Sequence, residues 1–171
     1  TARSRGLGDV YKRQVIYICR PQSRGHLELK SSNPSDDPLM FPNYLSEEQD
    51  MIDTRNALRE TCRVFMQDAF KPYRGERSKP GLDVDIDDDD QVDQWIRETG
   101  ETLYHPVGTC KMGNDGMSVV DEHLKVHDID GLRVVDASIM PTLIGGNTNA
   151  PTIMIAEKAC LLYTSDAADD P

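Results

Sequence analysis

The stretch GGNTNAPTIMIAEKA, residues 145–159, predicts a loop that runs into the N-terminus of a helix. Its two glycines allow the backbone to approach a ligand closely. An Asn or Thr within residues 147–149 suits the helix cap, and Pro151 suits the first turn. A helix N-terminus carries free N–H groups and a partial positive charge, so this end favours an electron-rich ligand group. An ordinary capped helix without a ligand fits the same pattern.

A second stretch, LYHPVGTCKMG at residues 103–113, places His105, Cys110 and Met112 close together in an irregular loop. A general base, a soft-metal site and a tight buried turn all fit this spacing. Catalytic residues often lie on such loops, which favours a role for His105 as a base. A copper site needs a second histidine, and none stands nearby in ligand spacing. We therefore expect no metal, and we expect Met112 to lie in the core.

The remaining apolar patterns indicate several short strands. Residues 15–18 form a β-rich apolar run, and residues 26–30 alternate between apolar and polar side chains. Residues 33–43 contain three prolines and are expected to be a connection. Residues 117–141 predict further short strands, broken at Gly131.

Two more helices are expected between residues 46 and 100. The first has Ser46 as its N-cap and one apolar stripe, which we expect to pack in the core. The stripe consists of Met51, Leu58, Cys62, Phe65 and Ala69. The second lies around Trp95 and ends at Gly100, after the acidic run of residues 83–93. We expect its aspartates to form a solvated surface and a helix cap, because a calcium loop needs spaced ligands and an internal glycine.

The composition narrows the class of protein. The chain has 171 residues, which suggests one domain, and a formal net charge of −11. Such an acidic chain does not favour nucleic acid or an anionic membrane as its partner. No apolar run approaches the roughly 20 residues of a membrane span. Residues 15–159 contain an odd number of cysteines without metal-ligand spacing, which favours free thiols in a reducing compartment. We therefore expect a cytoplasmic or peripherally membrane-associated protein.

Both ends of the chain resemble translated sequencing-adapter DNA. VYKRQ at residues 10–14 and CLLYT at residues 160–164 can be encoded by nearly complementary DNA strands. Two unrelated protein ends rarely share this property, so residues 1–14 and 160–171 are set aside from the fold prediction. Residues 15–159 are expected to be a piece of a longer protein.

Several motifs together resemble the C-terminal signature of the glucose–methanol–choline family of flavin-dependent oxidoreductases. These motifs are HPVGTCKMG (105–113), VVDASIMP (134–141) and GGNTNAPTIMIAEKA (145–159), preceded by RPQSRGHLELKSSNP (20–34), NYLSEEQD (43–50) and YRGE (73–76). Within the family, residues 117–141 are most similar to dehydrogenases of choline and related primary alcohols. The order and spacing of independent motifs make the resemblance specific.

The resemblance implies a role for individual residues. The histidine of the HPVGT motif is the family's catalytic base, and it corresponds to His105. Its partner position before the last helix corresponds to Asn149, with Asn147 as an alternative. The positions that match flavin contacts are Asp136, Ala137, Asn149, Pro151 and Thr152. The implied cofactor is FAD, the implied substrate is a small alcohol, and the electron acceptor stays open between a quinone or electron carrier and oxygen.

The expected architecture is α+β. An antiparallel substrate-domain sheet with helices and the His105 loop is expected in residues 15–131, and residues 132–159 supply the strand and helix that return to an FAD-binding domain. The chain lacks a Gly-x-Gly-x-x-Gly motif that opens a βαβ unit, so we expect it to be inactive alone. The alternative from another class is a non-catalytic interaction module that uses the acidic surface. Flavin dependence of the intact protein discriminates between the two.

Overall fold

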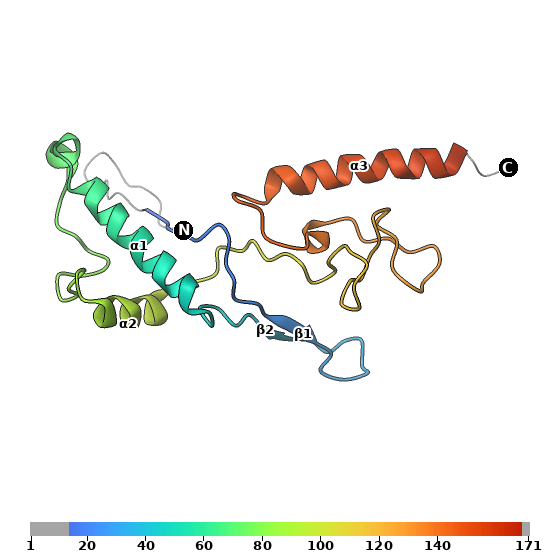
Figure 1. Cartoon of the computed structure of the whole chain (residues 1–171), viewed down its shortest axis with the longest axis horizontal. Coiled ribbons are helices and arrows are strands. Elements are labelled where there is room, and N and C mark those ends of the chain that lie inside the picture. Colours follow the sequence, from blue (N-terminus) through green and yellow to red (C-terminus); the bar gives the residue numbers. More distant parts are fainter. Residues whose placement is uncertain (1–13, 169–171) are drawn as a thin grey trace. The chain divides into compact units, whose positions relative to one another are not determined.

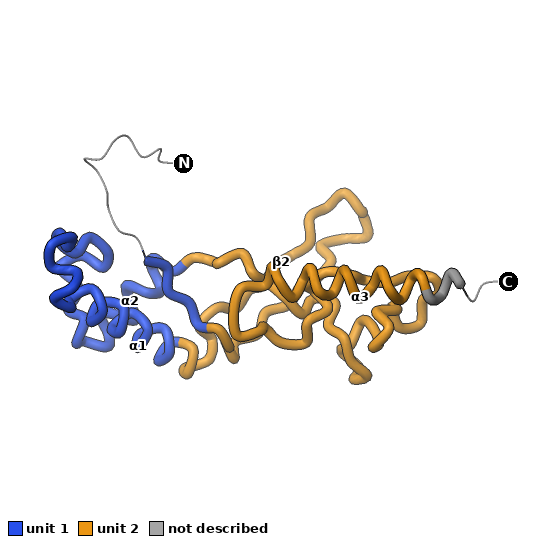
Figure 2. Tube along the Cα trace, turned by 90° about the horizontal axis from the view of Figure 1, so that it is seen from above, with its two compact units in different colours: residues 1–18, 51–100 blue, residues 19–50, 101–171 orange. Residues whose placement is uncertain are grey.

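The computed structural model describes residues 14–168 and divides the chain into two compact units (Figure 2). One unit consists of residues 1–18 and 51–100, and the other of residues 19–50 and 101–171. The elements are β1 (His26–Glu28), β2 (Leu39–Phe41), α1 (Glu48–Phe65), the 3-10 helix η1 (Asp68–Tyr73), α2 (Asp89–Thr99), the 3-10 helix η2 (Ala137–Ile139) and α3 (Asn149–Ala168) (Figure 1). The class is α+β, as predicted. Most of the adapter-like segment 1–14 and the last three residues of the segment 160–171 lie outside the described residues.

The strand predictions are partly wrong. β1 was predicted, but its antiparallel partner β2 lies in the segment predicted to be a connection, and His26 pairs with Phe41. Two prolines, Pro38 and Pro42, flank β2 without entering it, so neither removes a backbone donor from the ladder. Residues 15–18 form no strand, because an apolar run becomes a strand only where a neighbouring segment pairs with it.

The predicted strands of residues 117–141 are isolated bridges. Val120 bridges to Val126, and Lys125 bridges to Arg133. Gly131 has φ +74°, the left-handed conformation that glycine adopts readily, and it makes the predicted break. The segment therefore forms a compact set of turns held by short backbone pairings.

Helix α1 begins at Glu48, two residues after the predicted cap Ser46, so that prediction is wrong. Its predicted stripe is confirmed in part: Met51 and Leu58 are buried, and Cys62 and Phe65 are half-buried. The helix ends at Phe65, so Ala69 belongs to η1 and is exposed. A sequence pattern continued past a helix end accounts for this last error.

The start of α1 is fixed by a residue far away in sequence. The backbone N–H of Glu47 donates to Ser23 Oγ at 3.1 Å. Asp50 in the first turn is 1% exposed, and its two carboxylate oxygens accept hydrogen bonds from Gln22 N and Ser23 N, each at 2.8 Å. This acid therefore anchors the loop before β1 to the beginning of the helix.

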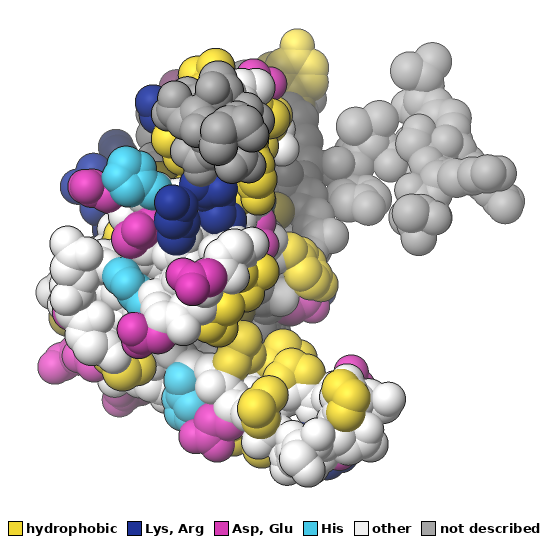
Figure 3. Space-filling model, turned by 90° about the vertical axis from the view of Figure 1, so that its right-hand side faces the viewer, with side chains coloured by type: hydrophobic (Ala, Val, Ile, Leu, Met, Phe, Trp, Pro, Cys, Tyr) yellow, Lys and Arg dark blue, Asp and Glu magenta, His cyan; other side chains and the backbone are white. Residues whose placement is uncertain are grey.

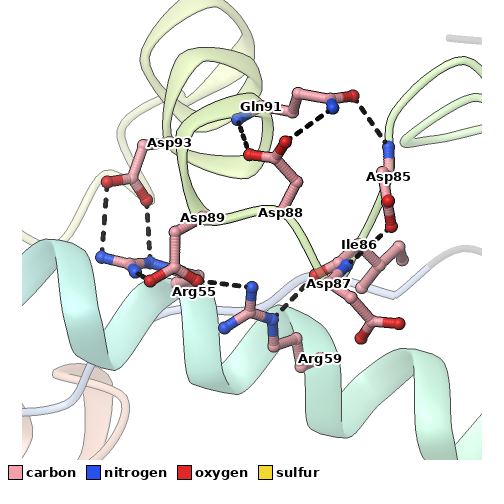
Figure 4. Close-up of polar contacts among 9 residues, drawn as sticks. All are labelled: Arg55, Arg59, Asp85, Ile86, Asp87, Asp88, Asp89, Gln91 and Asp93. Carbon is pink, nitrogen blue, oxygen red and sulfur yellow. Dashed lines mark hydrogen bonds and ion pairs between the residues drawn. The ribbon is translucent and has the colours of Figure 1, made fainter.

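The acidic run of residues 83–93 is largely exposed, as predicted, and two of its aspartates also form ion pairs with α1 (Figure 4). Asp88 caps α2 as predicted, since its side chain accepts from Gln91 N at 3.1 Å. Asp93 Oδ1 lies 2.9 Å from Arg55 Nε, and Asp89 pairs with both Arg55 and Arg59. The side chains of Arg55 and Asp93 are 14% and 28% exposed, so their pair is half-buried, whereas Asp89 is exposed; the pairs join two helices.

Replacing Arg55 by alanine is expected to destabilise the contact between α1 and α2 by about 1–3 kcal/mol, because the half-buried Asp93 loses its ion-pair partner and Asp89 keeps only Arg59. Faster amide hydrogen exchange in α2 of the full-length protein measures the effect. The matched control is Arg63→Ala, whose exposed side chain pairs with Glu60 on the same helix. The control is expected to change stability by at most about 0.5 kcal/mol. Equal effects of the two substitutions contradict the prediction.

The second unit has its own apolar core. Its buried members are Val120, Leu124, Ile139, Met140, Ile155 and Ala159. Met112 packs against this cluster, as predicted. Apolar side chains reach the surface at several places on the face in Figure 3. Exposed large apolar residues of α3 include Ile153, Met154 and Leu161. None of the helices within residues 14–168 is long and apolar enough to cross a membrane.

Candidate functional site

His105 lies in a loop whose backbone is unusual on its N-terminal side. Tyr104, the residue before it, has φ +61°, a left-handed conformation that is uncommon for a residue other than glycine. The His105 side chain is half-buried, and within the described ranges it takes part in no hydrogen bond or ion pair. The imidazole is therefore available to a ligand. Backbone conformations of this kind gather at functional sites.

The C-terminal side of the loop is tethered to η2. Cys110 N donates to Ser138 O at 3.1 Å, and Met112 N donates to Ile139 O at 2.8 Å. Gly108 has φ +88°, and a Cβ atom built there lies 3.3 Å from the carbonyl oxygen of Met140. The VGTCKM segment therefore runs close beside the DASIM turn, and a glycine permits the approach.

Gly108→Ala is expected to destabilise the full-length protein by about 2–3 kcal/mol, because alanine disfavours a left-handed φ and its Cβ crowds the backbone carbonyl oxygen of Met140. Two controls separate these causes. Gly131→Ala has the φ penalty alone, because nothing lies within 4 Å of its Cβ, and Gly116→Ala has neither. Thermal unfolding is expected to rank the losses in the order Gly108, Gly131, Gly116. A loss at Gly108 no larger than at Gly131 contradicts the crowding.

Asp136 and Ala137 form the start of η2. Asp136 is the N-cap, and its Oδ1 accepts hydrogen bonds from Ser138 N at 2.7 Å and Ser138 Oγ at 2.5 Å. Ala137 packs against the core of the unit. The carboxylate of Asp136 therefore shapes the turn, while the backbone carbonyls of the turn accept hydrogen bonds from the His105 loop.

Helix α3 begins at Asn149, as predicted from the GGNTNAPT stretch. Asn149 is exposed, while Pro151 and Thr152 are half-buried in the first turn. Thr148 is buried, and its carbonyl accepts from Thr152 N at 3.0 Å and Thr152 Oγ1 at 2.7 Å. The first N–H groups of a helix have no acceptor within the helix, so this exposed end can hold an electron-rich group.

The structure brings the three predicted segments into one unit with a shared core. Val107, two residues after His105, packs against the same cluster as Ala137 of η2 and Ile155 of α3. Within residues 14–168, His105 and Asn149 form no hydrogen bond with each other. Asn147, the alternative partner, is exposed in the loop before α3. The predicted boundary at residues 131 and 132 concerns the whole protein and stays a prediction.

Two polar residues that contact the His105 loop, Thr102 and Tyr44, were not predicted from the sequence. Thr102 Oγ1 accepts a hydrogen bond from Tyr104 N at 3.1 Å and another from Tyr44 Oη at 3.0 Å. A threonine that bonds the N–H two residues later is a known local motif, so the first contact has a sequence signal. The second joins positions 58 residues apart and has none.

The two most evident pockets of the described chain lie away from His105. One is lined by residues between 77 and 91, and the other by α3 together with residues 112–139. No group of three or more His, Cys, Asp or Glu in residues 14–168 is placed to hold a metal ion.

Comparison with known proteins gives a consistent family assignment. Residues 21–156 match the family described as GMC oxidoreductase. The chain is 52% identical over 139 residues to an oxygen-dependent choline dehydrogenase of Pseudomonas fluorescens, and 50% identical over 139 residues to one of Cronobacter sakazakii. In each case the alignment covers 81% of this chain and 24% of the relative. The chain thus spans about a quarter of the length of these relatives.

The fold of this chain is also similar to parts of solved oxidase structures. The crystal structure of pyridoxine 4-oxidase from Mesorbium loti matches with a TM-score of 0.79 and 32% identity, over 86% of this chain and 28% of that one. A fungal aryl-alcohol oxidase matches with a TM-score of 0.78 and 28% identity, over 88% of this chain and 25% of that one.

Proposed function

The chain belongs to the GMC oxidoreductase family, and from this premise we propose that it is part of a longer enzyme that oxidises a primary alcohol to the aldehyde with FAD as cofactor. The observation that carries the proposal is the shared core of the His105 loop, η2 and the start of α3. These are the three segments to which the family resemblance assigns the base, a flavin contact and the helix that faces the flavin.

The described residues fit the cofactor. The exposed N-terminus of α3, at Asn149, offers unused N–H groups and the positive end of a helix dipole to the electron-rich edge of a flavin. Pro151 and Thr152 lie in the same turn, and Asp136 holds the turn that presents Ala137. When bound, FAD supplies the acceptor for the hydride that leaves the alcohol carbon.

The residues of this chain do the acid–base and positioning work. His105 takes the proton of the alcohol hydroxyl, because the resulting alkoxide pushes electrons toward the carbon and makes it a better hydride donor. The side-chain amide of Asn149 donates a hydrogen bond to the same oxygen and fixes the orientation of the C–H bond. The proton ends on His105 and leaves again to solvent after the aldehyde departs.

The substrate proposed is choline or a similar primary alcohol, on the ground of the two curated relatives named as choline dehydrogenases. Neither the acceptor of the electrons nor a site for the cationic head of choline is assigned to residues of this chain. The ion pairs of Asp89 and Asp93 use part of the acidic run, which weakens the alternative of an acidic interaction surface.

The test uses the purified full-length protein under anaerobic conditions. Choline, and separately uncharged primary alcohols, are mixed with the enzyme while the absorbance of the oxidised flavin is followed. Rapid bleaching by choline alone supports both the reaction and the substrate. Bleaching by uncharged alcohols alone supports the reaction and contradicts the choline proposal. A protein that holds no flavin contradicts the proposed function and favours the non-catalytic interaction module.

A further inference from the structure

We propose that Thr102 is a positioning residue, whose hydroxyl holds the backbone in front of His105 so that the imidazole points at the substrate. The proposal rests on the proposed function of His105 as the base. Thr102 itself is assigned no contact with substrate or flavin. It acts through the conformation of Tyr104.

The hydroxyl of Thr102 joins two segments of one unit. Its oxygen accepts from Tyr104 N at 3.1 Å and from Tyr44 Oη at 3.0 Å. A threonine hydroxyl has two acceptor lone pairs, and both are used in this arrangement. Tyr44 lies in the segment between β2 and α1, so the His105 loop is fastened to a part of the fold that is distant in sequence.

The backbone of Tyr104 needs such support. Its φ of +61° lies in the left-handed region, which costs a residue with a Cβ about 1–2 kcal/mol. The Tyr104 side chain is 80% exposed, so packing of the ring does little to hold this conformation. The hydrogen bond from its N–H to Thr102 holds the peptide plane that precedes Tyr104, the plane from which this φ turns the chain toward His105. Relaxation of φ at Tyr104 rotates the next residue, His105.

The other side of the loop is fixed independently. Cys110 and Met112 are tethered through backbone hydrogen bonds to Ser138 and Ile139 of η2. His105 thus sits between two attachments, one made by the Thr102 hydroxyl and one made by backbone. The hydroxyl is the attachment that a single side-chain substitution can remove without changing the shape of the residue.

Thr102→Val in the full-length enzyme keeps the shape of the side chain and removes the hydroxyl. We expect the rate of flavin reduction at saturating alcohol to fall about 10- to 100-fold, since a misplacement of about 1 Å costs up to this much, while KM changes little. Thr102→Ser keeps the hydroxyl and is expected to stay within about threefold of the unaltered enzyme. Tyr44→Phe removes one of the two donors to the Thr102 hydroxyl, and its rate of flavin reduction is expected to lie between those of Thr102→Val and Thr102→Ser.

Three results overturn the inference. The first is a normal rate in Thr102→Val while His105→Ala is inactive, which leaves the proposed function intact. The second is an equal loss from Thr102→Val in a His105→Ala background, because a residue that acts through His105 adds nothing once His105 is gone. The third is a fall in melting temperature or flavin content that accounts for the rate and is not restored by Thr102→Ser. An active His105→Ala enzyme instead overturns the proposed function itself.

Discussion

Replacing His105 by alanine in the full-length protein is expected to lower the rate of flavin reduction by an alcohol about 10²- to 10⁴-fold. The half-buried imidazole takes part in no hydrogen bond or ion pair within residues 14–168, so its nitrogen atoms are available to the substrate hydroxyl. Without it, the hydroxyl proton must leave to water, and the hydride leaves a neutral alcohol rather than an alkoxide. Anaerobic stopped-flow measurement of oxidised-flavin absorbance gives the rate directly.

Two comparisons make the His105 experiment specific. His123→Ala removes an exposed histidine of the same unit, whose Nε2 lies 3.9 Å from Glu122 Oε1. This substitution is expected to leave the rate of flavin reduction unchanged. Added imidazole is expected to restore part of the rate in His105→Ala, because a small base can enter the space of the lost ring. Flavin content is measured in both variants, so that a lost cofactor is not mistaken for a lost base. Reduction of the flavin by His105→Ala at the normal rate contradicts the assignment.

The helices show how much of the fold local sequence carries. Asp88 caps α2 and Gly100 ends it, and the loop before Asn149 leads into α3, because the signals for these ends lie within a few residues of them. The strand errors have the opposite cause. Pairing of β1 with β2 depends on which segments meet, and the apolar run at residues 15–18 does not meet a partner strand. A three-residue strand between two prolines leaves no periodic pattern to read.

In the candidate site, too, features within one local motif were predicted and contacts between distant residues were not. His105 and Asn149 stand in compact motifs that resemble those of the family, so the sequence offers them as candidates, and their roles stay predictions. The contact of Tyr44 with Thr102, and that of Asp50 with Gln22, join residues far apart in the chain. Such pairs exist only after folding, and no spacing rule predicts them.

The solvent exposure of the acidic run was predicted from the sequence, but the ion pairs of Asp89 and Asp93 with α1 were not. A series of aspartates was expected to face water, because charged side chains are rarely buried without partners. Arg55 and Arg59 on α1 supply the partners, since residues four apart lie on one face of a helix. The charge pattern of α1, considered together with that of residues 83–93, held this information, whereas each segment alone did not.

Replacing Asp50 by asparagine is expected to destabilise the junction between the loop before β1 and α1 by about 2–3 kcal/mol, because a buried carboxylate that accepts two backbone hydrogen bonds is lost. The asparagine oxygen can replace one of the bonds, but its NH₂ group faces the other donor. Amide hydrogen exchange at Gln22 and Ser23 in the full-length protein is expected to accelerate about 30- to 160-fold, which corresponds to this loss of free energy. The exposed Asp37 provides the control, and Asp37→Asn is expected to change neither amide.

The pH dependence of the difference in amide exchange between the unaltered protein and Asp50→Asn gives an independent check. Burial alone raises the pKa of Asp50, but the hydrogen bonds from Gln22 and Ser23 and the charge of Arg24 outweigh it and lower the pKa below 3.8. Since the pKa is lower in the folded than in the unfolded chain, the stabilisation by Asp50 is complete above about pH 4 and is lost as the pH falls through the lowered value. The difference in exchange between the unaltered protein and Asp50→Asn, corrected for intrinsic rates, is therefore expected to be constant from about pH 7 to 5 and to shrink below about pH 4. A difference that grows as the pH falls contradicts the anchoring role of the ionised carboxylate.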